Sequence, residues 1–313
     1  MTVSRVLNDR PGVSDATRAR VRAAIEGLGY RQNLAARTLA GGRSGLLGAV
    51  NVNTAFHGPS QTLFGIEAAA RASDRMLTFV SLTDPTSDKI ALAIETLADA
   101  HVEGLIINAP VRAAVDALAE VQASVRLPLV VTSHDATAGS SVAIDQEAGA
   151  RTAVRHLLEL GHDTVHHVGG AKGWVDADLR AKGWRSELRA WGRSAPSPVL
   201  GSWTARSGYD AGRKLAADPA VTAIFVANDE MATGVVLALH EARRTVPDDV
   251  SVVGFDDAAD AAFRLPPLTT IRQDFDELGR RSVARLISML DGGAPQRETI
   301  QPELVIRSST RSR

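Results

Sequence analysis

The sequence of 313 residues contains no cysteine, which excludes disulfides, thiolate metal sites and cysteine nucleophiles from this chain. No run of apolar residues reaches the roughly 18 that a membrane-spanning helix requires. The N-terminus lacks the apolar core of a secretory signal peptide. Walker and dinucleotide-binding glycine spacings are also missing, since the one glycine-rich run, at 169–173, fits neither. We therefore expect a cytoplasmic protein with no membrane partner, no cofactor and no metal.

Charge is distributed unevenly along the chain. Residues 1–44 contain eight arginines and three acidic residues, a net charge of +5 in a chain whose total is −1. The remaining residues therefore carry −6. A basic segment on an acidic body favours a polyanionic partner at one end of the molecule. On charge alone, a solvated arginine-rich helical end explains the pattern equally well.

The basic segment has the pattern of short helices. Residues 2–8 place three apolar side chains at helical spacing before a Pro-Gly break. Ser14 is positioned to cap a second helix, for which Gly29 is the predicted stop. Asn33 is positioned to cap a third helix, which would end at the glycine pair 41–42.

Beyond residue 44, apolar strands alternate with amphipathic helices. We predict strands at 46–52, 77–82, 104–108, 128–132, 164–168, 199–203, 223–227, 250–255 and 303–307. We predict helices at 61–72, 90–100, 111–121, 149–160, 180–190, 208–217, 230–242 and 276–290. This rhythm predicts parallel sheets with helices on both faces. Because the pattern occurs twice, it predicts two α/β lobes with a ligand cleft at the carboxyl ends of their strands.

Several motifs follow one another in a specific order along nearly the whole chain. They are TVSRVLN at 2–8, VSDATR at 13–18, NLAARTLAG at 33–41, LGH at 160–162, ANDEMA at 227–232, SVVGFDD at 251–257 and PLTTI at 267–271. Together they resemble the lac repressor family of transcriptional regulators. Further stretches, including HGPSQ at 57–61 and LRAKGW at 179–184, are most similar to the member that gives the family its name.

This resemblance implies an architecture. We expect a two-lobe, periplasmic-binding-protein-like effector domain of two doubly wound parallel sheets, preceded by an incomplete all-α helix-turn-helix headpiece and a hinge helix. The expected divisions are headpiece 1–32, hinge helix and linker 33–45, and effector-binding and dimerisation domain 46–313, with an N-lobe at about 46–144 plus 275–302 and a C-lobe at about 145–272 plus 303–313. The family's first headpiece helix would precede Met1, so we expect base-specific binding to depend on it. Because the tetramerising helix of the name-giving member would follow Arg313, we expect a homodimer.

The resemblance also implies operator DNA as a partner. The positions that match the family's DNA contacts are Thr2, Ser4, Arg5, Asn8, Ser14, Thr17, Tyr30, Asn33 and Leu39. Arg5 could form two hydrogen bonds with guanine, or contact a phosphate. Leu39 would wedge into the minor groove and bend the DNA, or pack against the partner's hinge. The matching serine and asparagine positions would contact the DNA backbone, or simply cap helices.

A sugar effector is the second implied partner. The positions that match the family's effector contacts are Phe56, Pro59, Asp176, Arg180, Trp203, Asn228, Asp256, Gln273 and Phe275. Arg180, predicted at the start of a helix, could hydrogen-bond two adjacent hydroxyls or form a surface salt bridge. Trp203, predicted in a strand, could stack on the sugar ring or belong to the core. Asn228 and Asp256 could bind hydroxyls, or serve as helix caps and turn residues.

Three positions differ from the name-giving member. Trp174 and Asp176 are different there, and Ser133 stands where the resemblance places a ligand-binding aspartate. The expected effector is a galactoside or a related sugar.

Two other classes of protein remain open. An enzyme could use the histidines near residues 162–167 or the Asp256-Asp257 pair, but His166 and His167 would point to opposite faces of a strand, and no partnering base is evident. A sugar-binding protein of transport would share the two-lobe fold, but the missing signal peptide and the hinge motif argue against it.

Overall fold

The structure is a computed structural model, and it describes residues 2–7, 11–28, 43–135 and 139–313. The chain divides into two compact units, Met1–Ser44 and Gly45–Arg313, which are described in turn. None of the described helices is long and apolar enough to cross a membrane.

The first unit contains two described helices, α1 (Thr2–Leu7) and α2 (Asp15–Gly27). The predicted cap is confirmed, because the Ser14 hydroxyl accepts a hydrogen bond from the backbone N–H of Thr17 at 3.4 Å. The predicted stop at Gly29 agrees with the end of α2, because the last helical residue is Gly27, Leu28 is the C-cap and position 29 directly follows that cap. The third helix predicted from Asn33 lies outside the described residues.

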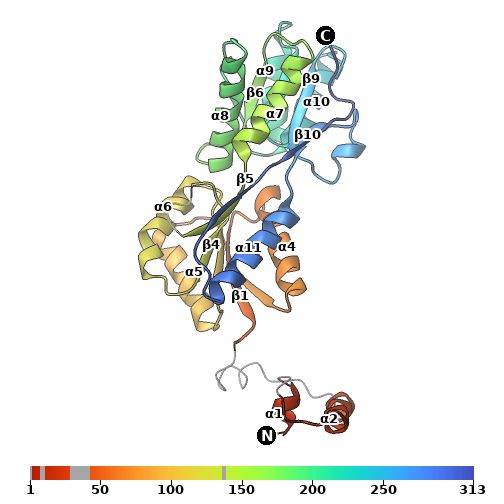
Figure 1. The fold of residues 1–313 in the computed structure, drawn as a ribbon. Helices are drawn as coiled ribbons and strands as arrows, with labels where there is room; N and C mark the ends of the chain where they lie inside the picture. Colours follow the sequence, from red (N-terminus) through yellow and green to blue (C-terminus); the bar gives the residue numbers. More distant parts are fainter. Residues whose placement is uncertain (1, 8–10, 29–42, 136–138) are drawn as a thin grey trace. The chain divides into compact units, whose positions relative to one another are not determined.

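The second unit contains two six-stranded sheets (Figure 1). The first has the order β11-β5-β4-β3-β1-β2, and all its pairings are parallel. Its strands are β1 (Leu46–Val52), β2 (Met76–Leu82), β3 (Leu105–Asn108), β4 (Leu129–Val131), β5 (Ser140–Ile144) and β11 (Arg297–Ile300). We call this sheet and its helices the N-lobe.

The second sheet has the order β12-β10-β9-β8-β6-β7, and only β12 runs antiparallel to its neighbour. Its strands are β6 (His166–Gly169), β7 (Val199–Leu200), β8 (Ala223–Val226), β9 (Ser251–Asp256), β10 (Thr269–Arg272) and β12 (Glu303–Val305). We call this sheet and its helices the C-lobe. The predicted pair of doubly wound α/β lobes is confirmed.

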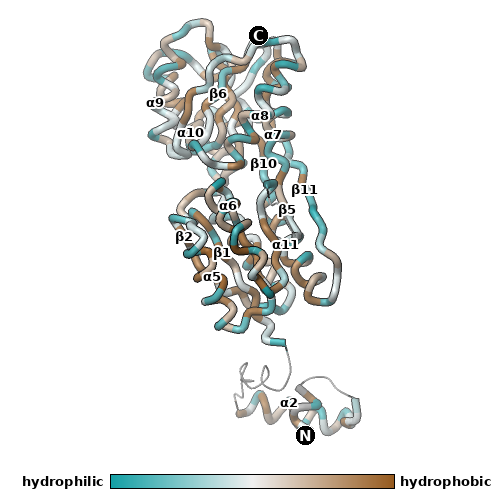
Figure 2. Tube along the Cα trace, turned by 90° about the vertical axis from the view of Figure 1, so that its left-hand side faces the viewer, coloured by the Kyte–Doolittle hydropathy of each residue, from teal (hydrophilic) through white to brown (hydrophobic). Residues whose placement is uncertain are grey.

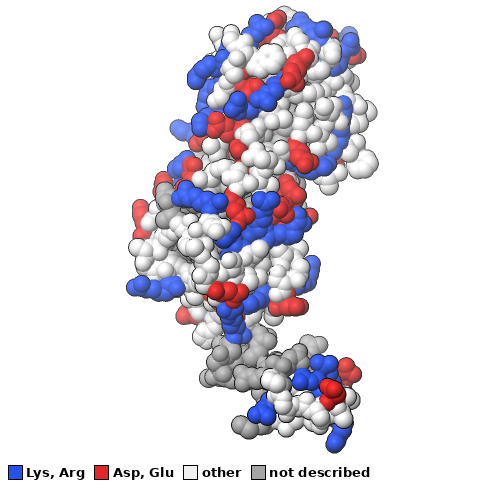
Figure 3. Space-filling view, viewed as in Figure 1, with Lys and Arg blue, Asp and Glu red and all other residues white. Residues whose placement is uncertain are grey.

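Helices cover both faces of each sheet, as apolar strands buried on both sides require. In the N-lobe, α5 (Ser87–Asp99) and α6 (Arg112–Val121) cover one face, and α4 (His57–Ala72) and α11 (Phe275–Leu290) cover the other. In the C-lobe the two layers are α7 (Gln146–Glu159) with α8 (Val175–Ala190), and α9 (Ala205–Ala216) with α10 (Asp229–Glu241). Hydrophobic stretches accordingly run along strands such as β1 and β6 in the interior of each lobe (Figure 2). On the outside, charged side chains of both signs interleave over the visible face of residues 45–313 (Figure 3).

The chain passes between the lobes three times, from β5 to α7, from β10 to α11 and from β11 to β12 (Figure 1). Parallel strands end at one edge of each sheet, so the carboxyl ends of both sheets and the first two crossovers meet at a single cleft. Short 3-10 turns at Gln122–Ser124 and Ala261–Phe263 lie in connections outside these sheets.

Three strands and several element ends differ from the predictions. Strands β5, β10 and β11 were not predicted, because their serines, threonines, arginines and glutamate weaken the apolar signal. Helix α8 begins five residues before Arg180, so this residue lies in its second turn and not at its start. Strand β7 stops at Leu200, so Trp203 was wrongly placed in a strand; it lies in a turn with φ of +72°.

Helices α4 and α11 cross with their backbones in contact. A Cβ atom added to Gly65 would lie 2.3 Å from the carbonyl oxygen of Phe275, and one on Gly279 would lie 2.1 Å from the backbone of Gly65. No other residue type fits either position without a shift. This crossing holds the starts of both helices together at the cleft, where the rings of His57 and Phe275 meet with centroids 5.9 Å apart.

Candidate functional site

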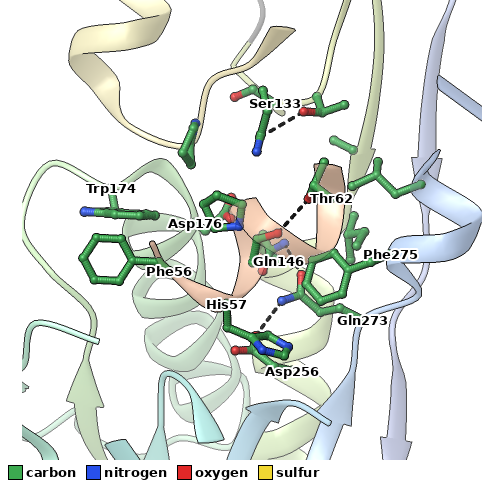
Figure 4. A pocket seen from close by; sticks show the side chains of 18 of the residues that line it. Phe56, His57, Thr62, Ser133, Gln146, Trp174, Asp176, Asp256, Gln273 and Phe275 are labelled. Carbon is green, nitrogen blue, oxygen red and sulfur yellow. Dashed lines mark hydrogen bonds between the residues drawn. The ribbon is translucent and has the colours of Figure 1, made fainter. Parts of the chain in front are cut away.

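A pocket between the lobes gathers all nine predicted effector-contact positions. It is lined by Phe56, His57, Gly58, Pro59, Thr62, Asn108, Pro110, Thr132, Ser133, His134, Val142, Ala143, Ile144, Gln146, Trp174, Asp176, Arg180, Trp203, Asn228, Glu230, Asp256, Gln273, Phe275 and Leu278. Figure 4 shows side chains from both lobes converging on it. The cleft expected from the two-lobe fold and the positions expected from the family resemblance therefore coincide in this pocket.

Four buried side chains that line the pocket form a closed chain of contacts that we call the polar ring. Figure 4 labels three of them, Gln146, Gln273 and Asp256. Arg180 Nε donates to Gln146 Oε1 at 2.9 Å, and Gln146 Nε2 donates to Gln273 Oε1 at 2.8 Å. Gln273 Nε2 then donates to Asp256 Oδ1 at 2.7 Å, and this oxygen lies 3.7 Å from Arg180 Nη1. Gln146 is the first residue of α7, and Gln273 directly follows β10. The ring therefore connects the β5–α7 and β10–α11 crossovers to the ion pair of Arg180 with Asp256.

Arg180 is buried without being isolated. Its guanidinium lies over the ring of Phe255, 3.9 Å from the centroid, and donates a short hydrogen bond to the carbonyl of Ala227. Burial lowers the pKa of Arg180, and the Asp256 carboxylate opposes that shift. The arrangement leaves a cation whose remaining N–H groups can donate to a ligand.

Asp256, which lines the pocket, and Asp229, which does not, both have raised pKa values. Burial raises the pKa of Asp256 to about 6, with Arg180 pulling the other way. Burial, reinforced by Asp256, raises the pKa of Asp229 to about 7, although its carboxylate accepts hydrogen bonds from Thr270 at 2.6 Å and from the Ala258 N–H at 2.8 Å. Asp229 was not predicted as a site residue, and its place beside Asn228 at the end of β8 was the available signal.

Asn228 caps the N-terminus of α10, which is the role that the sequence offered as the alternative to hydroxyl binding. Its side-chain oxygen accepts from the N–H of Met231 at 3.0 Å, and its Nδ2 donates to the carbonyl of Trp203 at 3.0 Å. It lines the pocket as well, so capping and ligand contact are compatible. The Trp203 indole N–H is buried and has no hydrogen-bond partner among the described residues.

Another part of the pocket is aromatic. The rings of Phe56 and Trp174 meet edge to face with centroids 5.1 Å apart, and Trp174 meets Trp203 in the same way at 5.3 Å. Phe56 belongs to the N-lobe and both tryptophans to the C-lobe. Two backbone hydrogen bonds also cross the cleft here, from the Arg112 N–H to the Gly173 carbonyl at 2.8 Å and from the Val175 N–H to the Pro110 carbonyl at 3.0 Å.

The N-lobe edge of the pocket is a chain of neutral groups. Thr132 Oγ1 donates to Asn108 Oδ1 at 3.0 Å, and Asn108 Nδ2 donates to Asn51 Oδ1 at 2.7 Å. Asn51 Nδ2 in turn donates to the carbonyl of Pro59 at 3.2 Å, within the first turn of α4. Ser133 lines the pocket beside this chain, and its buried hydroxyl has no partner within the described residues.

Gln146, Trp174 and Asn108 line the pocket but were not predicted as site residues. Asn108 had a usable signal, a polar residue directly after an apolar strand. Gln146 was missed because the strand before it, β5, was missed too.

The histidines do not form a metal site. Among the described residues, no group of three or more His, Cys, Asp and Glu side chains could hold a metal ion. His167 is fully buried, stacked on Phe225 with centroids 4.8 Å apart, and burial lowers its pKa to about 4. It is a neutral residue of the core.

The positions matched to DNA contacts lie in the first unit. Thr2 and Arg5 are exposed on α1, Ser14 is exposed, and Thr17 is half-buried, with 2.9 Å between the two hydroxyl oxygens of Ser14 and Thr17. The structure does not describe the Ser4 side chain or residues Asn8, Tyr30, Asn33 and Leu39.

Two family models match the chain. Residues 1–33 match the model for bacterial regulatory proteins of the lacI family, and residues 154–310 match a periplasmic-binding-protein-like domain.

Relatives of known function match nearly the entire sequence. The lactose operon repressor of Escherichia coli strain K12 is 36% identical over 99% of this chain and 86% of its own length, and the ribose operon repressor of the same strain is 31% identical over 98% and 95%. A crystal structure of the lac repressor dimer bound to operator and the anti-inducer ONPF superimposes with a TM-score of 0.89 at 35% identity, covering 99% of this chain and 94% of that one.

Proposed function

The chain belongs to the lacI family of bacterial regulatory proteins, and from that membership we propose that it is a sugar-responsive transcriptional repressor that acts in the cytoplasm. The observation that carries the proposal is the cleft. It combines the Arg180–Asp256 pair, amide side chains and aromatic rings in one buried pocket between two lobes. Planar polar groups suit sugar hydroxyls, and aromatic rings suit the C–H face of a sugar.

The proposed contacts follow from hydrogen-bonding capacity. Arg180 donates to two ligand hydroxyls, Asp256 accepts from one, and Asn228 and Gln273 complete the polar side, while Phe56 and Phe275 pack on the sugar. The ligand is a galactoside or a related sugar, and the galactosides are the first class to test. Asp176, Pro59 and Trp203 complete the contact set.

We propose that the sugar acts on DNA through the crossovers. Arg180 would donate hydrogen bonds to the sugar, and Gln273 would exchange them with it, so both residues would loosen their contacts within the polar ring. Because Gln146 and Gln273 of that ring lie at two of the crossovers, the change would alter how the lobes close. In the proposed division, the headpiece (1–32) and hinge (33–45) of a homodimer bind operator DNA, and the effector domain (46–313) binds the sugar. DNA must then change sugar affinity by the same factor as sugar changes DNA affinity.

Calorimetric titration with galactosides, glucosides and pentoses, each assayed for turnover, tests the proposal. We expect saturable binding of one class without turnover, binding lost in Arg180→Ala and Asp256→Ala, and a Kd that shifts when operator DNA is present. Turnover would identify an enzyme and overturn the proposal. Sugar binding that never changes with DNA would point to the alternative, a sugar-binding protein of transport type.

A further inference from the structure

Two groups of pocket residues differ in how their polar groups are satisfied. Every member of the polar ring has a partner inside the ring. The second group is Phe56, Trp174 and Asp176, which we call the acidic aromatic group and which Figure 4 shows near one another. The Asp176 carboxyl makes no hydrogen bond and no ion pair with any part of the chain that the structure describes.

Asp176 nevertheless faces the pocket from the first turn of α8. Burial raises its pKa, Arg180 and His134 act against that shift, and Asp135 adds to it. Of the two groups that act against the shift, Arg180 is already paired with Asp256 at 3.7 Å. His134 lines the same pocket, and its buried Nε2 has no partner among the described residues. Asp135 forms its own ion pair with Arg112.

The pocket has more carboxyl groups than permanent cations. Asp176, Glu230 and Asp256 line it, whereas Arg180 is its single lining arginine or lysine among the described residues. Glu230 is exposed to solvent, and Asp256 is neutralised by Arg180. Asp176 is left as the half-buried lining carboxyl with no hydrogen bond or ion pair to a described residue, and a cation in the pocket would stabilise its ionised form.

Aromatic rings surround this charge. Phe56 and Trp174 are half-buried, so part of each ring remains accessible from the pocket. Aromatic faces attract ammonium groups through the ring quadrupole, and the attraction grows when water is excluded. A carboxylate next to two accessible rings is the chemistry that recognises a protonated amine.

We infer that the effector is an amino sugar, whose ammonium group binds Asp176 beside the exposed parts of the Phe56 and Trp174 rings while its hydroxyls bind the polar ring. This rests on the proposed sugar response and names the chemical class that the site selects. The unpartnered Trp203 indole N–H and Ser133 hydroxyl are further hydrogen-bonding atoms for the same ligand. A neutral sugar would supply only hydroxyl donors and leave the charge of Asp176 uncompensated.

The test is calorimetric titration of the full chain at about pH 6.5, where amino groups of this kind are largely protonated. Galactose, galactosamine and N-acetylgalactosamine form one series, and glucose, glucosamine and N-acetylglucosamine form the other. We expect one amine to bind at least tenfold more tightly than both neutral members of its series. Raising the salt from about 0.05 to 0.5 M should weaken this preference.

Asp176→Asn keeps the shape and removes the charge, so it should abolish the amine preference, measured as the ratio of amine affinity to neutral-sugar affinity within one series. The ratio is compared because Asp176 also belongs to the proposed contact set, so neutral sugars should weaken as well. Asp178→Asn is the matched control, because Asp178 lies in the same helical turn but is exposed and does not line the pocket. It should keep the preference. If Asp176→Asn does not fold, the N-acetyl pairs and the salt series on the unmodified chain still decide the question.

The outcomes separate the two proposals. Neutral sugars that bind as tightly as the amines, or more tightly, would overturn the amino-sugar assignment and leave the sugar sensor standing. An amine preference that survives in Asp176→Asn would overturn the role of this carboxyl. If neither series binds, the inference fails, and the proposed response to sugars is left to the wider panel of galactosides and pentoses.

Discussion

The two lobes have the same topology but present different chemistry to the cleft. The N-lobe sheet ends in amides and a hydroxyl, namely Asn51, Asn108 and Thr132, which are hydrogen-bonded in sequence. The C-lobe sheet ends in Asp229 and Asp256, two buried carboxyls with raised pKa values. Neutral networks fix geometry at any pH, whereas buried charges make stability depend on protons and partners. The N-lobe edge is therefore a rigid support, and the C-lobe edge is the responsive side.

The largest effect should come from breaking the charge balance of the C-lobe. Arg180→Met removes the partner of buried Asp256 and the donor to Gln146, so we expect about 3–5 kcal/mol of lost stability, as for other buried pairs deprived of one member. Effector affinity should fall roughly a hundredfold, about 2.8 kcal/mol. Urea unfolding and calorimetry measure the two. Arg189→Met, an exposed arginine on the same helix, is the control. Equal losses in both variants would contradict the ion-pair argument.

The buried carboxyl of Asp229 should make the stability of the C-lobe depend on pH. Because the pKa of Asp229 is raised from 3.8 to about 7, the folded protein binds its proton more tightly than the unfolded chain does. Its contribution to stability is full below about pH 4 and is lost as pH rises through 7, by up to about 4 kcal/mol.

Asp229→Asn should flatten the pH dependence of the free energy of unfolding between about pH 4 and 7. The slope is compared, not the absolute stability, because the amide also disturbs the bonds to Thr270 and Ala258. Asp210→Asn, on the exposed face of α9, should leave the slope unchanged. Part of the slope should remain, because the pKa of Asp256 is also raised, to about 6. A slope as steep in Asp229→Asn as in the unmodified chain would contradict the role of Asp229.

In the N-lobe, Asn108→Ala should cost about 2 kcal/mol, because it leaves Asn51 Oδ1 without its donor and the Thr132 hydroxyl without its acceptor in a buried site. Unlike the loss in the C-lobe, this one should be the same at about pH 5 and pH 8, since every group involved is uncharged. Urea unfolding at both pH values checks it. A loss that changes with pH would remove the distinction between the lobes.

The smallest effect is expected for Thr132→Val, which keeps the side-chain shape and removes one hydrogen bond to Asn108 Oδ1. We expect about 1 kcal/mol, the usual net value of one such bond. Thermal or urea unfolding beside Asn108→Ala measures it. A loss as large as that of the asparagine variant would mean that the chain of bonds acts as one unit.

Much of the fold follows from local patterns in the sequence. Apolar runs such as 46–52 and 250–255 predicted buried parallel strands, and their repetition predicted two lobes. Ordered motifs such as ANDEMA and SVVGFDD led to the family, and through it to nine positions that all line one pocket. Patterns failed where an element was short or polar, as in β5 and β11, and consequently at Gln146.

Periodicity and ordered motifs are properties of the linear chain, so they were enough to predict the class of fold, the family and nine of the residues that line the pocket. Which groups meet depends on the folded arrangement. Gln146 and Gln273 lie far apart in the sequence but share a hydrogen bond of 2.8 Å. Among the described residues, Asp176 has no partner, while Asp256 is paired with Arg180. Hydrogen bonds and compensation of buried charge depend on distances across the cleft, and those distances exist only once three crossovers have brought the two sheets together.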